Sequence, residues 1–128
     1  MTFLNLKYLL LIVVVLSFIS CGFIQPGIGY TIKNNGDESI SNIKLYTSEK
    51  LEIVTVDDLS SKGQKIGFLS MKKNGSDGDY IIEFTRENGV VVKTNGGYYT
   101  NGRSLDQEVL IRIENDTVFM KFTGMKLY

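Results

Sequence analysis

Beyond residue 27, apolar and polar residues alternate in short segments that are separated by turn residues. Ile28, Tyr30 and Ile32 alternate with Gly29, Thr31 and Lys33, which is the period of a half-buried β-strand. Comparable β-rich segments lie at 42–46, 51–56, 64–71, 80–85, 90–92, 108–113 and 117–122. No window of this region keeps helical periodicity over three turns. The pattern therefore predicts an all-β fold of about seven or eight short strands.

Clusters of Gly, Asn and Asp mark the turns between these segments. Asn34 to Asp37 is one such cluster, and Asn88-Gly89 lies between two β-rich runs, which is among the strongest short signals of a hairpin. Gly96 to Gly102 is interpreted as a turn-rich stretch that carries aromatic residues. Residues 57–63 are polar except for Leu59, which we expect to close one end of the core.

Short strands at spacings near ten residues favour a β-sandwich or a barrel. We expect an antiparallel immunoglobulin-like sandwich over residues 28–128, and a small closed barrel is the alternative. The chain has no Ala but many Val, Ile, Tyr and Phe residues, a composition that disfavours a helical protein. With one Cys and no Trp, the sandwich would lack the disulfide and the core Trp of antibody domains.

The first twenty residues differ from the rest of the chain. Lys7 precedes an apolar run of about a dozen residues from Tyr8 to Ile19, which is short compared with the roughly 20 residues of a membrane-spanning helix. A basic start, an apolar run and a small residue before a cleavage site are typical of a secretory signal. Ser20 is that small residue, Cys21 follows it directly, and the apolar run is expected to be helical.

The junction Phe18-Ile19-Ser20-Cys21-Gly22 resembles a bacterial lipobox, although Phe18 stands where that family usually has Leu. The resemblance implies that residues 1–20 are a signal peptide, that Cys21 carries lipid and that residues 21–27 are a tether. An uncleaved N-terminal anchor and a buried core Cys are the alternatives. No interpretation gives Cys21 a disulfide, because the chain has no second Cys.

Removal of residues 1–20 would leave 108 residues with 13 basic and 14 acidic side chains, and a net charge of −1. This balance gives no electrostatic reason to expect nucleic acid as a partner. The expected partner is a membrane, reached through the N-terminal lipid. We therefore expect a lipid-anchored domain of the bacterial cell envelope, at the outer membrane or the periplasmic face rather than in the cytoplasm.

Two further stretches carry a family resemblance. Tyr30 to Gly36, followed by Ile40 to Tyr46, is similar to the first two strands of immunoglobulin-like adhesion and surface domains. In overall layout, with Gly97 to Gly102 followed by Leu105-Asp106, the chain resembles small lipoproteins of Bacteroidetes-type bacteria. Asp116-Thr117-Val118 is similar to the O-glycosylation site of proteins exported by such bacteria, with Thr117 as acceptor. These resemblances imply no enzymatic activity.

The residue inventory offers little for catalysis, so we expect no enzyme and no cofactor. A Ser nucleophile needs a base, which is usually His, and the chain has none. The Ser and Lys residues at 60–62 and 70–73 lack the Ser-x-x-Lys spacing of known acylating sites. The acidic pairs at 57–58 and 77–79 are interpreted as solvated loop residues, because glycosidases need two carboxyl groups facing each other across a cleft.

Metal binding is also not expected. The loop from Asn74 to Asp79 offers oxygen ligands among Gly residues, which suits Ca²⁺. The spacing departs from the EF-hand pattern, however, because Gly78 and Thr85 stand at its fifth and twelfth positions. A plain loop between strands is the simpler interpretation, and zinc and copper lack His ligands here.

Tyr98 and Tyr99, in a Gly-, Asn- and Thr-rich setting, are the strongest candidates for a binding surface. Tyr offers a large contact area at low entropic cost, and Asn101 and Arg103 are adjacent. The alternative is that one Tyr packs at the sandwich edge and the other lies on the surface. The sequence thus predicts a non-enzymatic binding or accessory module for an envelope protein or a glycan. The alternative function is an immunity or inhibitor lipoprotein that neutralises an envelope-acting toxin or enzyme.

Overall fold

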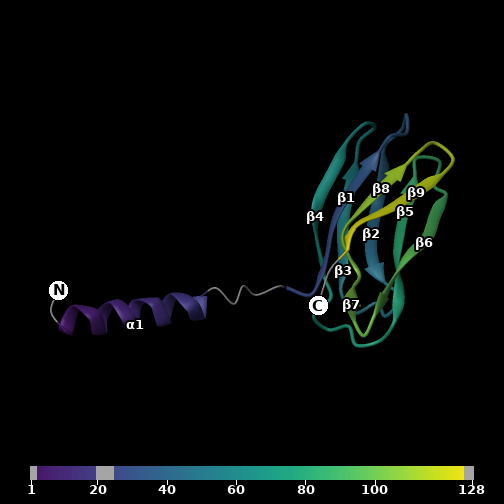
Figure 1. Cartoon of the computed structure of the whole chain (residues 1–128). Coiled ribbons are helices and arrows are strands. Elements are labelled where there is room, and N and C mark those ends of the chain that lie inside the picture. The colour runs from purple at the N-terminus through teal and green to yellow at the C-terminus, as the bar shows by residue number, and fades with distance from the viewer. Residues whose placement is uncertain (1–2, 20–24, 126–128) are drawn as a thin grey trace.

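The computed structural model describes residues 3–19 and 25–125, which form one helix and nine strands (Figure 1). Helix α1 spans Phe3–Ile19. The strands are β1 Gly27–Asn34, β2 Ile40–Thr47, β3 Ile53–Leu59, β4 Gln64–Ser70, β5 Gly78–Arg86, β6 Val91–Thr100, β7 Arg103–Ser104, β8 Asp106–Ile113 and β9 Val118–Met125.

Helix α1 confirms the expected helical segment near the N-terminus. Its residues are apolar on all sides, and Lys7 is its only charged residue. A helix of this kind needs apolar surroundings on every face. Within the described part of the chain, no helix combines the length and the apolarity needed to cross a membrane. Cys21, the expected lipidation site, lies outside the described residues.

The strands form two sheets, with the orders β4-β1-β8-β9 and β3-β2-β5-β6-β7. All pairings are antiparallel except that of β1 with β8, which is parallel. The predicted antiparallel-dominated β-sandwich is therefore confirmed, with eight strands of seven or more residues and the two-residue β7. The strand order differs from that of an immunoglobulin constant domain. Here β1 and β2 lie in different sheets, whereas the first two strands of that domain lie in the same sheet.

The core lies between the two sheets because the alternating apolar residues of each strand point to the same side. In the first sheet, Ile28 and Ile32 of β1 are fully buried. In the second sheet, Tyr80 and Phe84 of β5 are fully buried as well. The ring of Tyr80 lies 5.4 Å from that of Phe122 in β9, centroid to centroid, so aromatic contacts join the two layers. Leu59 is buried at the end of β3, as expected from its isolated apolar position.

The stretch from Gly96 to Tyr99 belongs to strand β6, so its interpretation as a turn is wrong. The pairing of β5 with β6 shifts register between Gly78 and Tyr80, which is a β-bulge rather than a reversal of the chain. Gly97 has φ +69° at this point, and the Phe122 ring occupies the space that a Cβ would need. Glycine is therefore required for the bulge and does not end the strand. The turn lies later, at residues 101–102.

Strand β4 is the edge strand of the first sheet, and its outer face is apolar. Ile66 and Phe68 share one face, as their spacing predicts, and that face is exposed to solvent. The inner face of β4 holds Leu69 and Gly67, where the Tyr30 side chain fills the space beside the glycine. At Gly67, the core face of β4 is thus filled by the Tyr30 ring of the neighbouring strand β1.

We predict that Ile32→Ala and Ile66→Ala differ sharply in stability. Ile32 is fully buried, so its truncation should lower the free energy of unfolding by about 2–5 kcal/mol. Ile66 is 65% exposed, and its truncation should lower the free energy by about 1 kcal/mol or less. Urea unfolding of the full chain in detergent, followed by tyrosine fluorescence, measures both. Equal losses would contradict the assignment of the two faces.

Candidate functional site

The loops gather at two opposite ends of the sandwich. At the entry end, where β1 begins, Gly27 pairs with Ser70 and the Pro26 carbonyl accepts a hydrogen bond of 2.8 Å from the Met71 amide. At the cavity end, where β1 ends at Asn34, lie the loops between β1 and β2, β3 and β4, β5 and β6, and β8 and β9. The eight residues of β1 separate the two ends by about 23 Å.

The candidate residues from the sequence lie at the entry end, where Asp77 organises them. The Tyr98 hydroxyl donates to Asp77 Oδ2 at 2.9 Å, and the Thr100 hydroxyl donates to Asp77 Oδ1 at 2.9 Å. The Asn101 amide donates to Asp77 Oδ1 at 2.8 Å. These bonds, led by that of the Asn101 amide, lower the pKa of Asp77, and the bond to Asp77 raises the pKa of Tyr98. These hydrogen bonds therefore tie the connection between β4 and β5, which carries Asp77, to the end of β6 and the turn that follows it.

Tyr99 is fully buried, so its place in the predicted binding surface is wrong. Neighbouring residues of a strand point to opposite faces, and in β6 Tyr98 points outward and Tyr99 inward. The Tyr99 ring packs 5.6 Å from that of Tyr80, centroid to centroid, and its hydroxyl donates to Glu49 Oε2 at 2.8 Å. Asn101 and Arg103 are exposed, as predicted, and Tyr98 is 51% exposed.

The loop from Asn74 to Asp79 is held by Glu49 of the loop between β2 and β3. Glu49 Oε1 accepts hydrogen bonds of 3.2 Å from the amides of Gly75 and Ser76. The Tyr99 hydroxyl, followed by these amides, lowers the pKa of Glu49. Hydrogen bonds thus engage both carboxylate oxygens of Glu49, whereas the buried Asn74 Oδ1 has no hydrogen-bond partner among the described residues. Across residues 3–19 and 25–125, no group of three or more His, Cys, Asp or Glu side chains is placed to hold a metal ion.

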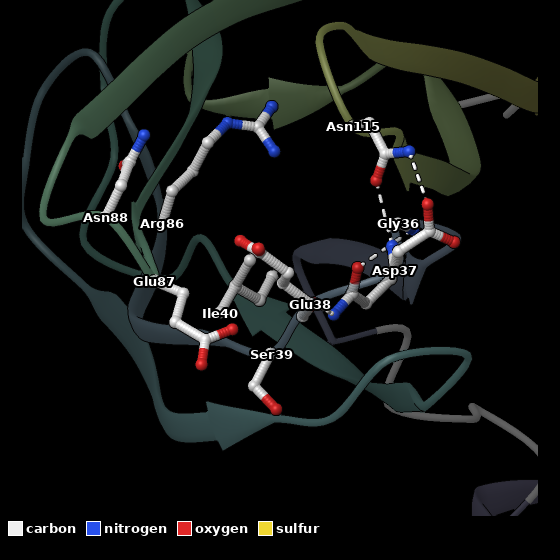
Figure 2. A pocket seen from close by; sticks show the side chains of 10 residues that line it. Gly36, Asp37, Glu38, Ser39, Ile40, Arg86, Glu87, Asn88 and Asn115 are labelled. Atoms are coloured by element: carbon white, nitrogen blue, oxygen red, sulfur yellow. Dashed lines mark hydrogen bonds between the residues drawn. The ribbon is translucent and has the colours of Figure 1, made fainter.

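A cavity of about 300 Å³ opens at the other end of the sandwich (Figure 2). Three loops and the strand ends beside them form its wall, so the cavity lies where both sheets end. Its lining is polar apart from Ile40 and Gly36, and it includes charged groups of both signs. The lining residues are Asn34, Gly36, Asp37, Glu38, Ser39, Ile40, Arg86, Glu87, Asn88 and Asn115.

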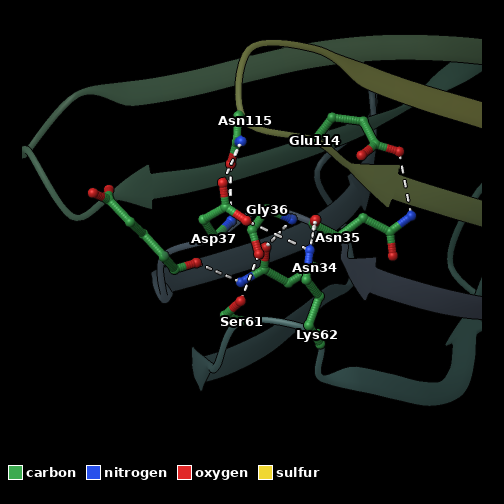
Figure 3. A network of polar contacts seen from close by, with 9 residues as sticks. Asn34, Asn35, Gly36, Asp37, Ser61, Lys62, Glu114 and Asn115 are labelled. Atoms are coloured by element: carbon green, nitrogen blue, oxygen red, sulfur yellow. Dashed lines mark hydrogen bonds and ion pairs between the residues drawn. The ribbon is translucent and has the colours of Figure 1, made fainter.

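Asn34 fixes the floor of this cavity (Figure 3). It is 1% exposed and lies at the end of β1, on the core side of the strand. Its Nδ2 donates to the carbonyls of Glu38 at 2.8 Å and Leu59 at 3.1 Å, and its Oδ1 accepts from the Gly36 amide at 3.1 Å. One buried amide therefore ties the loop between β1 and β2 to the end of β3.

A second set of contacts joins this loop to the turn between β8 and β9. Asn115 Oδ1 accepts from the Asp37 amide at 2.8 Å, and Asn115 Nδ2 donates to Asp37 Oδ2 at 2.9 Å. On the opposite side, the Ser61 hydroxyl donates to the Gly36 carbonyl at 2.6 Å, and Lys62 Nζ donates to the Asn35 carbonyl at 2.6 Å. The loop is thus pinned from both sheets, which keeps the cavity wall in one shape.

Arg86 forms the upper wall of the cavity. It is the last residue of β5 and has the same parity as buried Phe84, so it lies at the core side of the sheet. Its guanidinium lies 5.3 Å from the Phe84 ring centroid, and its Nη1 donates to the Glu114 carbonyl at 3.0 Å. Arg86 therefore bridges the two sheets and presents a guanidinium whose position is fixed.

The comparisons with known proteins show the fold alone. No family model matches the chain, and no curated protein matches it. A solved structure described as the NMR structure of a protein from Eubacterium rectale is similar, with a TM-score of 0.51 and 15% sequence identity. The match covers 80% of this chain and 94% of that one. At this sequence identity the similarity indicates a shared β-sandwich fold and gives no information about activity.

Sequence reasoning missed the cavity end because its residues are far apart in the chain. Asn34 and Asn115 were interpreted as turn residues, and Arg86 was not singled out. The one signal in the sequence was the parity of Arg86, which continues the inward-facing series of Tyr80, Ile82 and Phe84. A charged residue at the end of a strand, in the series of positions that face the core, indicates a charged group held between the two sheets.

We predict that Asn34→Ala lowers the free energy of unfolding by about 1–3 kcal/mol, because the buried Leu59 carbonyl loses its donor. Asn34→Asp should destabilise further at pH 7, since it turns a carboxylate toward two carbonyls. Hydrogen exchange at the Gly36 amide should accelerate in Asn34→Ala, which removes the oxygen that accepts from this amide. As a control, Gln64→Ala removes an exposed amide on β4 and should change stability by about 0.5 kcal/mol or less. Unchanged exchange at Gly36 would argue against the role of Asn34.

We also predict that acid weakens the entry end through Asp77. Hydrogen bonds in the folded chain lower the pKa of Asp77 below its ordinary 3.8. The stabilisation is therefore complete above that pH and is lost as the pH falls through the lowered value. The melting temperature of Asp77→Asn should start lower at pH 7 and fall less toward pH 3 than that of the unmodified chain. As a control, Asp57→Asn, at an exposed site on β3, should show the same pH dependence of the melting temperature as the unmodified chain. If Asp77→Asn shows that same dependence as well, the prediction is wrong.

Proposed function

We propose that this chain is a lipid-anchored protein of the bacterial envelope that binds a partner through its cavity end and catalyses no reaction. The observation that supports this most directly is the position of the cavity. It lies at the end of β1, opposite the end at which the chain enters the sandwich from Pro26. An anchor that precedes β1 would leave the cavity end facing away from the lipid surface.

Chain length limits how far the sandwich can stand from such an anchor. Cys21 lies six residues before Gly27 in the sequence, and six residues span at most about 20 Å. A lipid on Cys21 would therefore hold Tyr98, Asn101 and the rest of the entry end near the headgroups. The cavity end would stand about 23 Å farther out along β1, within reach of an envelope protein or a glycan. This geometry favours the cavity over the Tyr98 surface as the partner site.

The nature of the cavity also supports binding. Its volume is at the lower end of the range of small-ligand pockets, which begins near 300 Å³. Its walls are held by Asn34, by the Asn115–Asp37 contacts and by Arg86, so the groups that line it are arranged before a partner arrives. A preformed site loses less conformational entropy on binding than a mobile one.

The charge of the cavity end supports a second candidate function, an immunity or inhibitor lipoprotein. Among the residues that line the cavity, the carboxylates of Asp37, Glu38 and Glu87 outnumber the one cationic group, that of Arg86. An excess of negative charge steers association with a basic protein surface, and such association weakens as salt rises. A toxin gene beside the gene for this chain would favour this candidate, and a polysaccharide locus would favour a glycan partner.

We predict that photo-crosslinking residues at Ser39 or Asn88, both at the cavity end, yield discrete adducts in bacteria that produce the full chain. The same crosslinker at Asn101, at the entry end, should yield no protein adduct, because that end would lie near lipid. Cys21→Ser should release the chain from the membrane fraction and abolish its labelling with a lipid probe.

Each part of this proposal can fail separately. If Cys21→Ser remains membrane-bound and lipid-labelled, the anchor is wrong. If Asn101 gives the protein adducts and Ser39 and Asn88 give none, the cavity end is not the partner site. An assay that finds turnover lost on a single Asp or Ser substitution would replace the binding role with an enzymatic one.

A further inference from the structure

Charged groups of both signs line the cavity without neutralising one another. Arg86 stands on one wall, Glu38 lies on the opposite loop between β1 and β2, and Glu87 follows Arg86 directly in the chain (Figure 2). Among residues 3–19 and 25–125, the ion pairs are Lys62 with Asp37 and Arg112 with Glu114, and neither includes these three residues. A wall with separate positive and negative groups suits a ligand that carries both charges.

Arg86 has the capacity to bind an anionic group. A guanidinium has five N–H donors in a fixed planar arrangement, and the described contacts use one, to the Glu114 carbonyl. The Phe84 ring and this bond fix its plane, so the remaining donors keep their direction. Such an arrangement matches the two oxygens of a carboxylate. The carboxylates nearby disfavour a lone anion, so the ligand must also supply a positive group.

Glu38 supplies the opposite charge. Its backbone carbonyl is held by Asn34 Nδ2, while its carboxylate is exposed and has no hydrogen bond among the described residues. Figure 2 shows the Glu38 and Arg86 side chains directed into the same space. Asn88 adds a donor, because its Oδ1 is engaged by the Val90 amide and its Nδ2 is not. The wall therefore offers an acceptor for an ammonium group close to donors for a carboxylate.

From this arrangement we infer that the cavity binds a short zwitterionic peptide. Arg86 takes the carboxylate and Glu38 takes the ammonium group. A volume of about 300 Å³ accommodates a ligand of one or two residues. The inference rests on the proposed function, since it names the ligand chemistry of the same cavity, and it excludes a glycan without charged groups.

The test uses three related dipeptides. Alanylalanine carries both charges, its N-acetyl form keeps the carboxylate, and its C-terminal amide keeps the ammonium group. The full chain in a non-ionic detergent is titrated with each, and NMR shifts of the Asn88 and Asn115 side-chain amides report binding. We expect saturable binding of alanylalanine with a Kd on the order of 1 mM. Each blocked form should lose affinity by a factor of about ten or more, because each loses a charge-assisted hydrogen bond.

Variants assign the two charges. Arg86→Gln should lower affinity for alanylalanine about tenfold and remove the difference between the free and the amidated carboxylate. Arg86→Lys keeps the charge and should retain part of the affinity. Glu38→Gln, at an exposed position that leaves the fold intact, should remove the difference between the free and the acetylated amine. Lys72→Gln, which removes an exposed cation at the entry end, is the control and should bind as the unmodified chain does.

Several outcomes overturn the inference. These are no saturable binding of alanylalanine, equal binding of all three dipeptides, or unchanged binding in both Arg86→Gln and Glu38→Gln. If crosslinks from Ser39 and Asn88 persist while the dipeptides fail to bind, the partner site stands and the ligand chemistry is wrong. If those crosslinks are absent as well, the proposed function itself fails.

Discussion

The pairing of β1 with both β4 and β8 is the contact on which the rest of the structure depends. β1 is an inner strand of the first sheet, and its parallel partner β8 comes about eighty residues later in the chain. The strands between them cross to the second sheet and return, so neither sheet can be completed from one continuous segment. Ile28 and Ile32 occupy the centre of the core because β1 lies between its two neighbours. Loss of this pairing would divide the first sheet into β4 and the pair β8–β9 and would remove Ile28 and Ile32 from the core.

The same strand explains why the two ends of the sandwich differ. At its start, loops close on one another through Asp77 and Glu49, whose oxygens are used by neighbouring hydroxyls and amides. At its end, Asn34 turns its amide back into the protein and ties the loop that follows to the end of β3 in the second sheet. At one end most polar groups bond to one another, although the buried Asn74 Oδ1 has no hydrogen-bond partner among the described residues, and at the other end a cavity remains. The difference follows from where polar groups find partners, because both ends are rich in Asn and Asp.

Much of the fold could be predicted from the sequence, because alternation and turn residues act locally. Asn88-Gly89 marked a hairpin, and the alternation from Ile28 to Ile32 marked a half-buried strand, both confirmed. The Gly96–Tyr99 stretch was misassigned because glycine serves bulges as well as turns, and only the position of Phe122 distinguishes the two. The burial of Tyr99 follows from the bulge at Gly97, which changes the inward-facing series of β6 from the even-numbered residues up to Gly96 to Tyr99. The cavity was beyond local reasoning, since it joins Asn34, Arg86 and Asn115 through the strand order.

Arg86 shows how a cavity between the ends of two sheets can be stable and still bind a ligand. A buried-parity position would ordinarily take an apolar residue, and a charge placed there needs compensation. The Phe84 ring and the Glu114 carbonyl supply part of it while leaving most of the guanidinium donors directed outward. Pairing Arg86 with Glu38 or Glu87 inside the protein would satisfy the charges but close the cavity. Their separation keeps the site polar, and a ligand that carries both charges can form direct charge-assisted hydrogen bonds with each group.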